Sequence, residues 1–567
     1  MRIIPSKNQY IEKLLPFLAI YGVHLLGAFN DIMEIDAAQY AAISWEAASS
    51  NEYLEIKQEH KDYLDKPPLL FWISALSFKV FGFTNFAYRF LPTLLSFLGA
   101  YATYRLAKIY YSEQVAYWSS LILASSQAIF LMNQDLRTDN LLTTFVVFSI
   151  WQLATYFQNN TWKNLFLGVF GVAMAMMAKG PIGLVIPILA FSVDFAHKRQ
   201  WQNFFRWQYI PALLLLALFL LPMSIGLYQQ FDLHPEKMVN GQKAVSGLKF
   251  FYWTQSFGRI TGENVWSNNP DPFFLVHTTF WSFLPWTLFL VIAFVRETKE
   301  LILNKFKKIE LSQEVLIWAG FTLTFIALSR SKYQLNHYIY VVYPLGAIMT
   351  AKWIEKMSTW RKSWQAFFRF WLLFQHSILL LLAIILGFWA FPIDNYGVLF
   401  LVIAFFGLAF YFVFKPQNHF QRYLLPYLFS ILAANTLMNA WVYPTLLQKY
   451  QTESIIAKKM KGQPQKYNLA DFYVLGEGLM NNSLDFYTQQ INTYVGSLEQ
   501  ISKSEAWIAC NNENYEKHIA SSSSWEVLEK EVFEDYHVSE LTPLFLNPKT
   551  RKEQLQKVYL LKIRKKL

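Results

Sequence analysis

Long apolar stretches recur along the chain as far as residue 442, and they constrain its fold more than any other feature. A helix needs roughly 20 apolar residues to cross the hydrocarbon core of a bilayer. Roughly thirteen stretches come near that length, at 12–30, 86–108, 115–132, 138–157, 162–178, 181–196, 208–229, 273–295, 314–329, 336–355, 368–391, 396–414 and 422–442. Hydrophobic residues also make up 54% of the 567 residues, which is too many for a soluble protein of this size. The sequence therefore predicts a polytopic α-helical membrane protein.

Lysine and arginine gather in four links between the predicted spans, at 197–200, 296–308, 352–362 and 415–422. Cytoplasmic loops of membrane proteins are enriched in these residues. If the run 14–29 is a retained signal-anchor and the N-terminus is inside, thirteen spans place all four links in the cytoplasm. Anionic headgroups then account for the net charge of +11, and nucleic-acid binding is not expected. The loops 31–85 and 229–272 and the tail after Pro444 fall on the outer side.

The tail has a different composition, because it is polar and mixed in charge. Its pattern predicts three strands and two helices, at 472–475, 506–509, 558–561, 483–490 and 524–532. We therefore expect a transmembrane domain over 1–445 and a small α/β domain over 446–567. The single cysteine, Cys510, excludes an intramolecular disulfide and a cysteine zinc site.

Acidic and aromatic side chains begin the first long outer loop. The stretch 34–48 predicts an amphipathic interfacial helix, on which Asp36 and Tyr40 share a face and Glu34 precedes them. A carboxylate there is a candidate general base. The alternative is an acidic residue that complements the helix dipole.

The same loop continues with an acid–lysine–proline run, from Tyr63 to Trp72. Pro67 disfavours helical geometry at Lys66, and Pro68 suits the first turn of a following helix. Lys66 is then held beside the free N–H groups of a helix N-terminus, which is a good arrangement for binding a phosphate. The alternative is an ordinary charged loop before a helix.

Further polar residues lie at outer ends of later spans. Asp139 starts one span, although Thr138 or Asp135 at that position could instead cap the helix. Arg259, in the second long outer loop, offers two parallel N–H donors to a phosphate, or forms a salt bridge within the loop. Tyr338 opens another span and is a candidate donor to an anionic headgroup.

Two lysines that are predicted on the outer side, Lys332 and Lys179, have a competing interpretation as membrane anchors. Lys332 lies in the same run as Tyr338, together with His337, and either side chain could sit at the interface. Lys179 lies in the outer turn Lys179-Gly180-Pro181, where an anchor is the simpler interpretation.

The order of these motifs resembles a known family. Asp36-x-x-x-Tyr40, followed by Asp65-Lys66-Pro67-Pro68-Leu69, is similar to the first periplasmic loop of GT-C membrane glycosyltransferases. The resemblance is nearest to the bacterial branch of the dolichyl-phosphate-mannose protein mannosyltransferases, which includes the aminoarabinose transferase that modifies lipid A. Looser matches follow in the same order at 253–263, 271–274, 284–286 and 332–338, so the resemblance covers about residues 10–445.

The resemblance implies a GT-C fold in the bacterial inner membrane, with periplasmic amphipathic helices and a small periplasmic α/β domain. It implies an enzyme, expected as a monomer, that transfers a sugar with inversion from a polyprenyl-phosphate donor to a glycolipid such as lipid A, a polysaccharide or a protein. By position, Asp36 is the base and Asp139 supports it, while Lys66, Arg259 and Tyr338 bind the donor phosphate. The acceptor side is then left to Tyr40, Glu34 and Lys332.

The sequence departs from the family pattern at three positions. Gln39 stands where the lipid A enzyme has an arginine, Ser256 lies near a family histidine implicated in metal binding, and Asp65 replaces a glutamate. No cofactor is therefore firmly expected, and a divalent metal ion is left open with Asp65 as its candidate ligand.

Two other classes of protein compete with the glycosyltransferase. A ligase or polymerase of whole glycan chains also has many spans, but the acid–lysine–proline run argues against it. A transporter or flippase of a lipid-linked sugar places polar residues near the bilayer midplane. Gly168, Gly171 and Lys179 are the nearest to such a signal, whereas the other polar candidates cluster at outer ends of spans.

Overall fold

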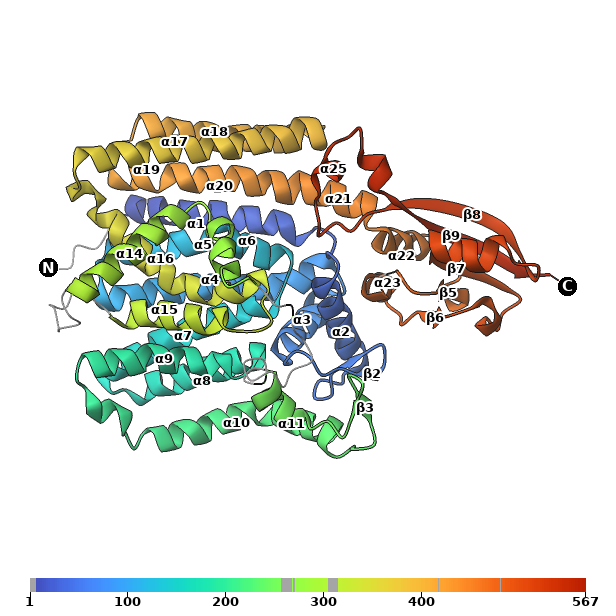
Figure 1. Cartoon of the computed structure of the whole chain (residues 1–567), viewed down its shortest axis with the longest axis horizontal. Helices are drawn as coiled ribbons and strands as arrows, with labels where there is room; N and C mark the ends of the chain where they lie inside the picture. The colour runs from blue at the N-terminus through green and yellow to red at the C-terminus, as the bar shows by residue number, and fades with distance from the viewer. Residues whose placement is uncertain are drawn as a thin grey trace.

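The protein is a bundle of long helices with a separate sheet domain at one end, as the computed structural model in Figure 1 shows. The structure describes residues 7–255, 258, 268, 271–303, 315–416, 418–479 and 481–566. Arg259 and Ser256 therefore lie outside the described residues.

Helices occupy every apolar stretch that the sequence singles out. They are α1 (Lys7–Ala28), α4 (Asn85–Tyr110), α5 (Glu113–Ala124), α6 (Gln127–Gln134), α7 (Thr138–Asn159), α8 (Trp162–Lys179), α9 (Ile182–His197), α10 (Tyr209–Leu227), α13 (Phe274–Ser282), α14 (Thr287–Leu303), α15 (Val315–Ser329), α16 (Tyr343–Lys356), α17 (Lys362–Ile384), α18 (Tyr396–Phe414) and α20 (Leu425–Leu437). Within the described residues, five helical runs are long and apolar enough to cross a membrane, or six if the bent pair α5–α6 is one span. The chain is thus a helical membrane protein.

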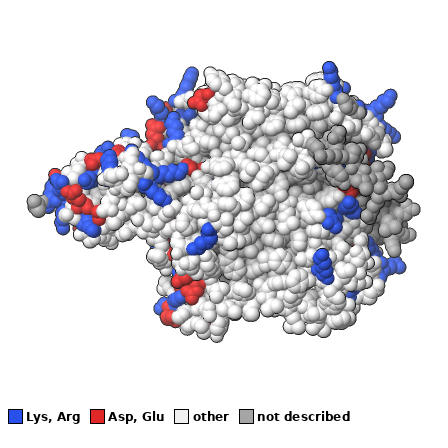
Figure 2. Space-filling view, turned by 180° about the vertical axis from the view of Figure 1, so that it is seen from behind, with Lys and Arg blue, Asp and Glu red and all other residues white. Residues whose placement is uncertain are grey.

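The membrane-capable helices divide into an inner and an outer set. In α7, 72% of the most apolar window is buried within the protein, whereas the run 201–232 around α10 buries only 22% and α18 only 28%. Figure 2 shows a broad, mostly uncharged surface between the two charged ends of the molecule. Apolar surface of that extent needs lipid around it.

The elements of the first long loop lie at the same end of the bundle as the tail (Figure 1). They are α2 (Asp36–Ser50), the hairpin β1–β2 (Lys57–Gln58 and Lys61–Asp62) and α3 (Leu69–Phe81). The basic links at 197–200 and 415–422 lie at the opposite end. The sequence therefore grouped the loops and the tail correctly.

The predicted helix over 34–48 exists as α2, but it does not lie as a half-exposed helix on a surface. Nearly all its residues after Asp36 are buried, because α2 packs between α3 and a helix of the tail, α23 (Asn481–Thr488). Six alanines along α2 allow both neighbours to approach closely.

The tail contains a five-stranded mixed sheet in the order β6-β5-β7-β9-β8. The helical run Leu425–Tyr450 leads out of the bundle, and α22 (Thr452–Gly462) begins the tail. The strands are β5 (Phe472–Leu475), β6 (Thr493–Val495), β7 (Glu505–Asn511), β8 (Trp525–Asp535) and β9 (Gln556–Lys565). The three predicted strands correspond to β5, β7 and β9, and the predicted helix at 483–490 corresponds to α23.

The predicted helix at 524–532 is wrong, because this segment is strand β8. It pairs antiparallel with β9, with a register shift between Val527 and Glu529, and Glu526 lies opposite Arg564. The many glutamates of β8 resemble an exposed helix in sequence. In the structure they line an edge strand, where charged side chains discourage pairing with other chains.

Candidate active site

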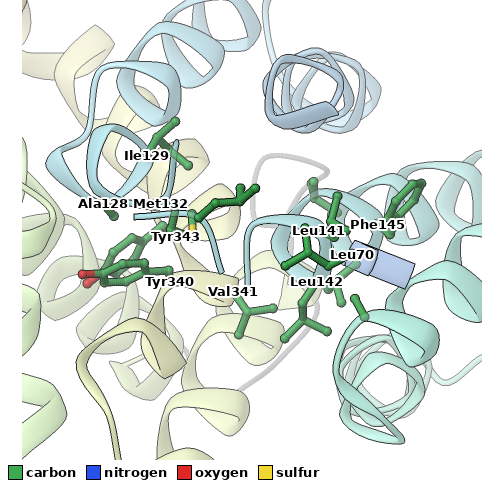
Figure 3. Close-up of a cluster of buried hydrophobic side chains, with 14 of the residues drawn as sticks. Leu70, Ala128, Ile129, Met132, Leu141, Leu142, Phe145, Tyr340, Val341 and Tyr343 are labelled. Carbon is green, nitrogen blue, oxygen red and sulfur yellow. The ribbon is translucent and has the colours of Figure 1, made fainter. Parts of the chain in front are cut away.

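A packed apolar core joins several elements of the bundle (Figure 3). It joins Leu70 of α3, Met132 of α6, Leu142 of α7 and Val341 of the short helix η4 (Asn336–Val342), all at most 2% exposed. Each of these elements also contributes or adjoins a polar candidate residue. The core therefore brings together motifs that are far apart in the sequence.

Asp36 is the first residue of α2, and it is ion-paired with Arg137 from the link between α6 and α7. The Arg137 guanidinium also contacts Asp135, with Nη2 2.7 Å from Oδ2. Burial opposes the charge of Arg137, but Asp135 and Asp36 together raise the pKa of this side chain. Arg137 is therefore a permanent cation, and it orients the partly exposed Asp36 carboxylate. Sequence reasoning assigned Arg137 no role.

Asp65 and Lys66 lie just before α3, and Lys66 Nζ is 2.5 Å from Asp65 Oδ2. Pro68 occupies the N-cap position of α3, so the predicted helix start after the proline pair is confirmed. Gln255 of the second outer loop donates a hydrogen bond to the Asp65 carbonyl oxygen. A cavity of about 30 Å³ beside them is lined by both loops, including Tyr63.

Tyr40 connects these two ion pairs electrostatically. Burial, followed by the charge of Asp36, raises the pKa of Tyr40 well above its ordinary value, with further contributions from Tyr63 and Asp65. Arg137 acts in the opposite direction. Tyr40 therefore keeps its proton.

Asp139 is almost fully buried in the first turn of α7. It is ion-paired with Lys179, and its other oxygen is 3.6 Å from Nε2 of His337. Lys179 Nζ also lies 3.8 Å from the centre of the Tyr338 ring. The structure therefore gathers Lys179, His337 and Tyr338 around the buried Asp139 carboxylate.

Neither capping alternative for α7 holds. Arg137 is at the N-cap position and makes no side-chain capping bond, and Asp135 instead binds Arg137.

The remaining predicted residues lie apart from this cluster. Burial and the nearby Glu453 of the tail raise the pKa of Glu34 well above its ordinary value, so Glu34 belongs to the contact with the tail. The Lys332 side chain is exposed, and its carbonyl oxygen accepts a bond from the Asn268 amide at 3.3 Å. Gln39, where the family has an arginine, donates to Gln58 at 2.9 Å.

The described residues do not form a metal site. They contain no group of three or more histidine, cysteine, aspartate or glutamate side chains placed to hold an ion. The candidate ligand Asp65 is paired with Lys66.

Comparison with known proteins identifies the fold. The family described as dolichyl-phosphate-mannose-protein mannosyltransferase matches residues 65–225. ArnT from Cupriavidus metallidurans, in a crystal structure with bound undecaprenyl phosphate, superposes with a TM-score of 0.72 over 98% of both chains at 14% identity. The chain therefore shares the fold of this structure, which is a GT-C fold. The ligand-free structure of ArnT superposes on the chain with a TM-score of 0.71.

Sequence relatives match a shorter part of the chain. An undecaprenyl phosphate-alpha-4-amino-4-deoxy-L-arabinose arabinosyl transferase from Proteus mirabilis is 26% identical over 56% of this chain and 54% of its own. A protein from Aquifex aeolicus is 27% identical over 62% of this chain and 65% of its own. The chain thus spans between half and two thirds of these relatives, and it resembles the aminoarabinose transferases.

Proposed function

We propose that the chain is a membrane glycosyltransferase that moves one sugar, with inversion, from a polyprenyl-phosphate donor to an acceptor. The observation that carries this proposal is that the buried Tyr40 feels the charges of both Asp36 and Asp65, and that Asp65 is paired with Lys66. The name of the Proteus mirabilis relative supports an undecaprenyl-phosphate-linked donor. The acceptor is a lipid A-like glycolipid, a polysaccharide or a protein, and the enzyme acts as a monomer in the bacterial inner membrane.

In the proposed reaction, Asp36 accepts the proton of an acceptor hydroxyl, whose oxygen attacks the anomeric carbon. The bond from that carbon to the phosphate oxygen breaks, and polyprenyl phosphate leaves with the bonding electrons. Lys66 stabilises the negative charge on the leaving phosphate, and Arg259 and Tyr338 are its further proposed ligands. Asp139 supports the site by holding the lysine that contacts the Tyr338 ring.

The acceptor side of the site is assigned to Tyr40, which keeps its proton and can donate to an incoming hydroxyl. Glu34 faces the tail, and we assign it no role in the reaction, whereas Lys332 stays a proposed acceptor-side residue.

We infer that the end of the bundle with the tail is periplasmic and that the chain crosses the membrane thirteen times. The basic links at the opposite end support this orientation. The native Cys510 is fully buried, so labelling by a maleimide measures the introduced cysteine alone. Ser49→Cys, on the tail side, should react with an impermeant maleimide in intact cells, and Ser363→Cys at the other end should react only after lysis.

The decisive experiment measures sugar transfer from polyprenyl-phosphate sugars to cell-envelope acceptors in membranes. Asp36→Asn and Lys66→Ala should each lower the rate by about 10²- to 10⁴-fold. Asp62→Asn and Lys237→Ala are matched controls, because these residues form a 2.9 Å ion pair outside the cluster and should leave transfer unchanged. Full transfer by both site variants contradicts the assignment, and movement of lipid without sugar transfer favours a flippase.

A further inference from the structure

The segment between α1 and α2 leads directly into Asp36, and it forms neither helix nor strand. Ile32 in this segment is 1% exposed, and Glu34 is 6% exposed. Buried backbone N–H and C=O groups need hydrogen-bond partners. No helix or strand supplies them here, so other side chains must.

Those partners come from the tail. The Gln451 amide donates through Nε2 to the Ile32 carbonyl oxygen at 2.9 Å, and its Oε1 accepts from the Glu34 N–H at 3.1 Å. Tyr487 Oη accepts from the Ile32 N–H at 2.8 Å and donates to Asn85 at 2.8 Å. Two tail side chains therefore satisfy three backbone groups of the segment, as a neighbouring strand would.

Burial of Gln451 and a neighbouring ion pair hold this contact in place. Gln451 is only 2% exposed and sits between α22 and α21 (Tyr443–Tyr450), the last helix of the run that leads out of the bundle. Lys458 of α22 adds an ion pair to Asp31 in the same segment. A buried amide with both ends bonded has one favourable orientation, so it fixes the position of the backbone at residues 32–34.

The backbone position at residues 32–34 determines where Asp36 lies. Glu34 is two residues before Asp36, and the first hydrogen bond of α2 runs from the Gln39 N–H to the Ile35 carbonyl at 3.1 Å. A shift at Glu34 therefore moves the start of α2 and its first side chain. A misplacement of about 1 Å at a reacting group lowers rates by as much as about 10²-fold.

We propose that Gln451 is a positioning residue for Asp36, and that the tail domain completes the active site through this contact. The inference rests on the proposed transferase function, in which Asp36 is the base. It gives the tail a role in the chemical step that is separate from acceptor binding.

The test compares Gln451→Met with Gln500→Met in the purified full-length protein. Methionine has about the same length but can make neither bond. Gln500 is a matched control, because its amide also bonds a backbone group, the Gly496 N–H at 2.7 Å, but only within the tail. Tyr487→Phe, which removes the hydroxyl from the same contact, is a second variant.

We expect Gln451→Met to lower kcat by about 10- to 100-fold, with the donor KM within about twofold of wild type, because Lys66 is held by other elements. Hydrogen exchange of residues 29–36 should become at least about tenfold faster in this variant, while the helices of the bundle keep their protection. Tyr487→Phe should give a smaller change of the same kind, and Gln500→Met should give neither.

Unchanged kcat in Gln451→Met overturns the proposal, as does faster exchange throughout the bundle, which indicates general unfolding. Hydrogen exchange needs no substrate. If the wild type transfers no sugar but the 29–36 exchange changes as expected, the contact stands and the proposed function fails.

Discussion

Replacing Asp139 with asparagine is expected to destabilise the protein strongly. The Asp139 side chain is 2% exposed, and its ion-pair partner Lys179 is 14% exposed. Removing one partner of a buried pair leaves an uncompensated charge and costs about 3–5 kcal/mol. His337, 3.6 Å away, cannot replace the lost carboxylate. We therefore expect the free energy of unfolding of Asp139→Asn to fall by an amount in that range.

Removing both charges should restore most of this loss. A buried pair replaced by groups of similar size is often neutral or stabilising, so Asp139→Asn with Lys179→Met should be about 2–4 kcal/mol more stable than the two single losses predict. Sugar transfer should nevertheless stay low, because Tyr338 loses the Lys179 contact at 3.8 Å. Stability and activity therefore separate in the double variant.

The assay is reversible unfolding by SDS titration in mixed micelles, followed by sugar transfer in the same preparation. Asp194→Asn is the matched control, because Asp194 pairs with Lys198 at 3.0 Å at the opposite end of the bundle. It should lose stability but keep transfer. If the two single losses add to within about 0.5 kcal/mol, Asp139 and Lys179 are not coupled and the reasoning is refuted.

Three further changes test other parts of the structure. Arg137→Gln frees the Asp36 carboxylate from its partner, so kcat should fall at least about tenfold in steady-state transfer assays, with a smaller change in donor KM. Arg89→Met removes a fully buried guanidinium that donates to four backbone carbonyl oxygens, and thermal unfolding should show a loss of at least about 3 kcal/mol. Burial raises the pKa of Asp485 to about 7, whereas the unfolded carboxyl titrates near 4. The folded tail thus holds the proton longer, its stability should fall as the pH rises from about 4 to about 7, and Asp485→Asn should flatten this dependence in thermal unfolding across that range.

The helical bundle could be predicted from the sequence because each span must satisfy its backbone within one continuous apolar segment. The Asp36 and Lys66 motifs could also be found, since their chemistry is local. Arg137 could not be assigned, because it meets Asp36 only through packing between residues 101 positions apart. Glu34 was expected on the acceptor side but faces the tail. Its surroundings depend on where the tail docks, which local sequence does not encode. Strand β8 was missed because its stability comes from pairing with β9, which no local pattern encodes.

In the described part of the site, each of three cations is paired with at least one carboxylate before any substrate binds. Lys66 is paired with Asp65, Lys179 with Asp139, and Arg137 with Asp36 as well as Asp135. A donor phosphate that binds these cations therefore competes with their carboxylates. The partly exposed pairs exchange most easily, because the buried one is held in low dielectric. In the proposed reaction, a phosphate that shares Arg137 with Asp36 weakens this ion pair while Arg137 still orients the carboxylate, so donor binding itself would make the base more available to the acceptor.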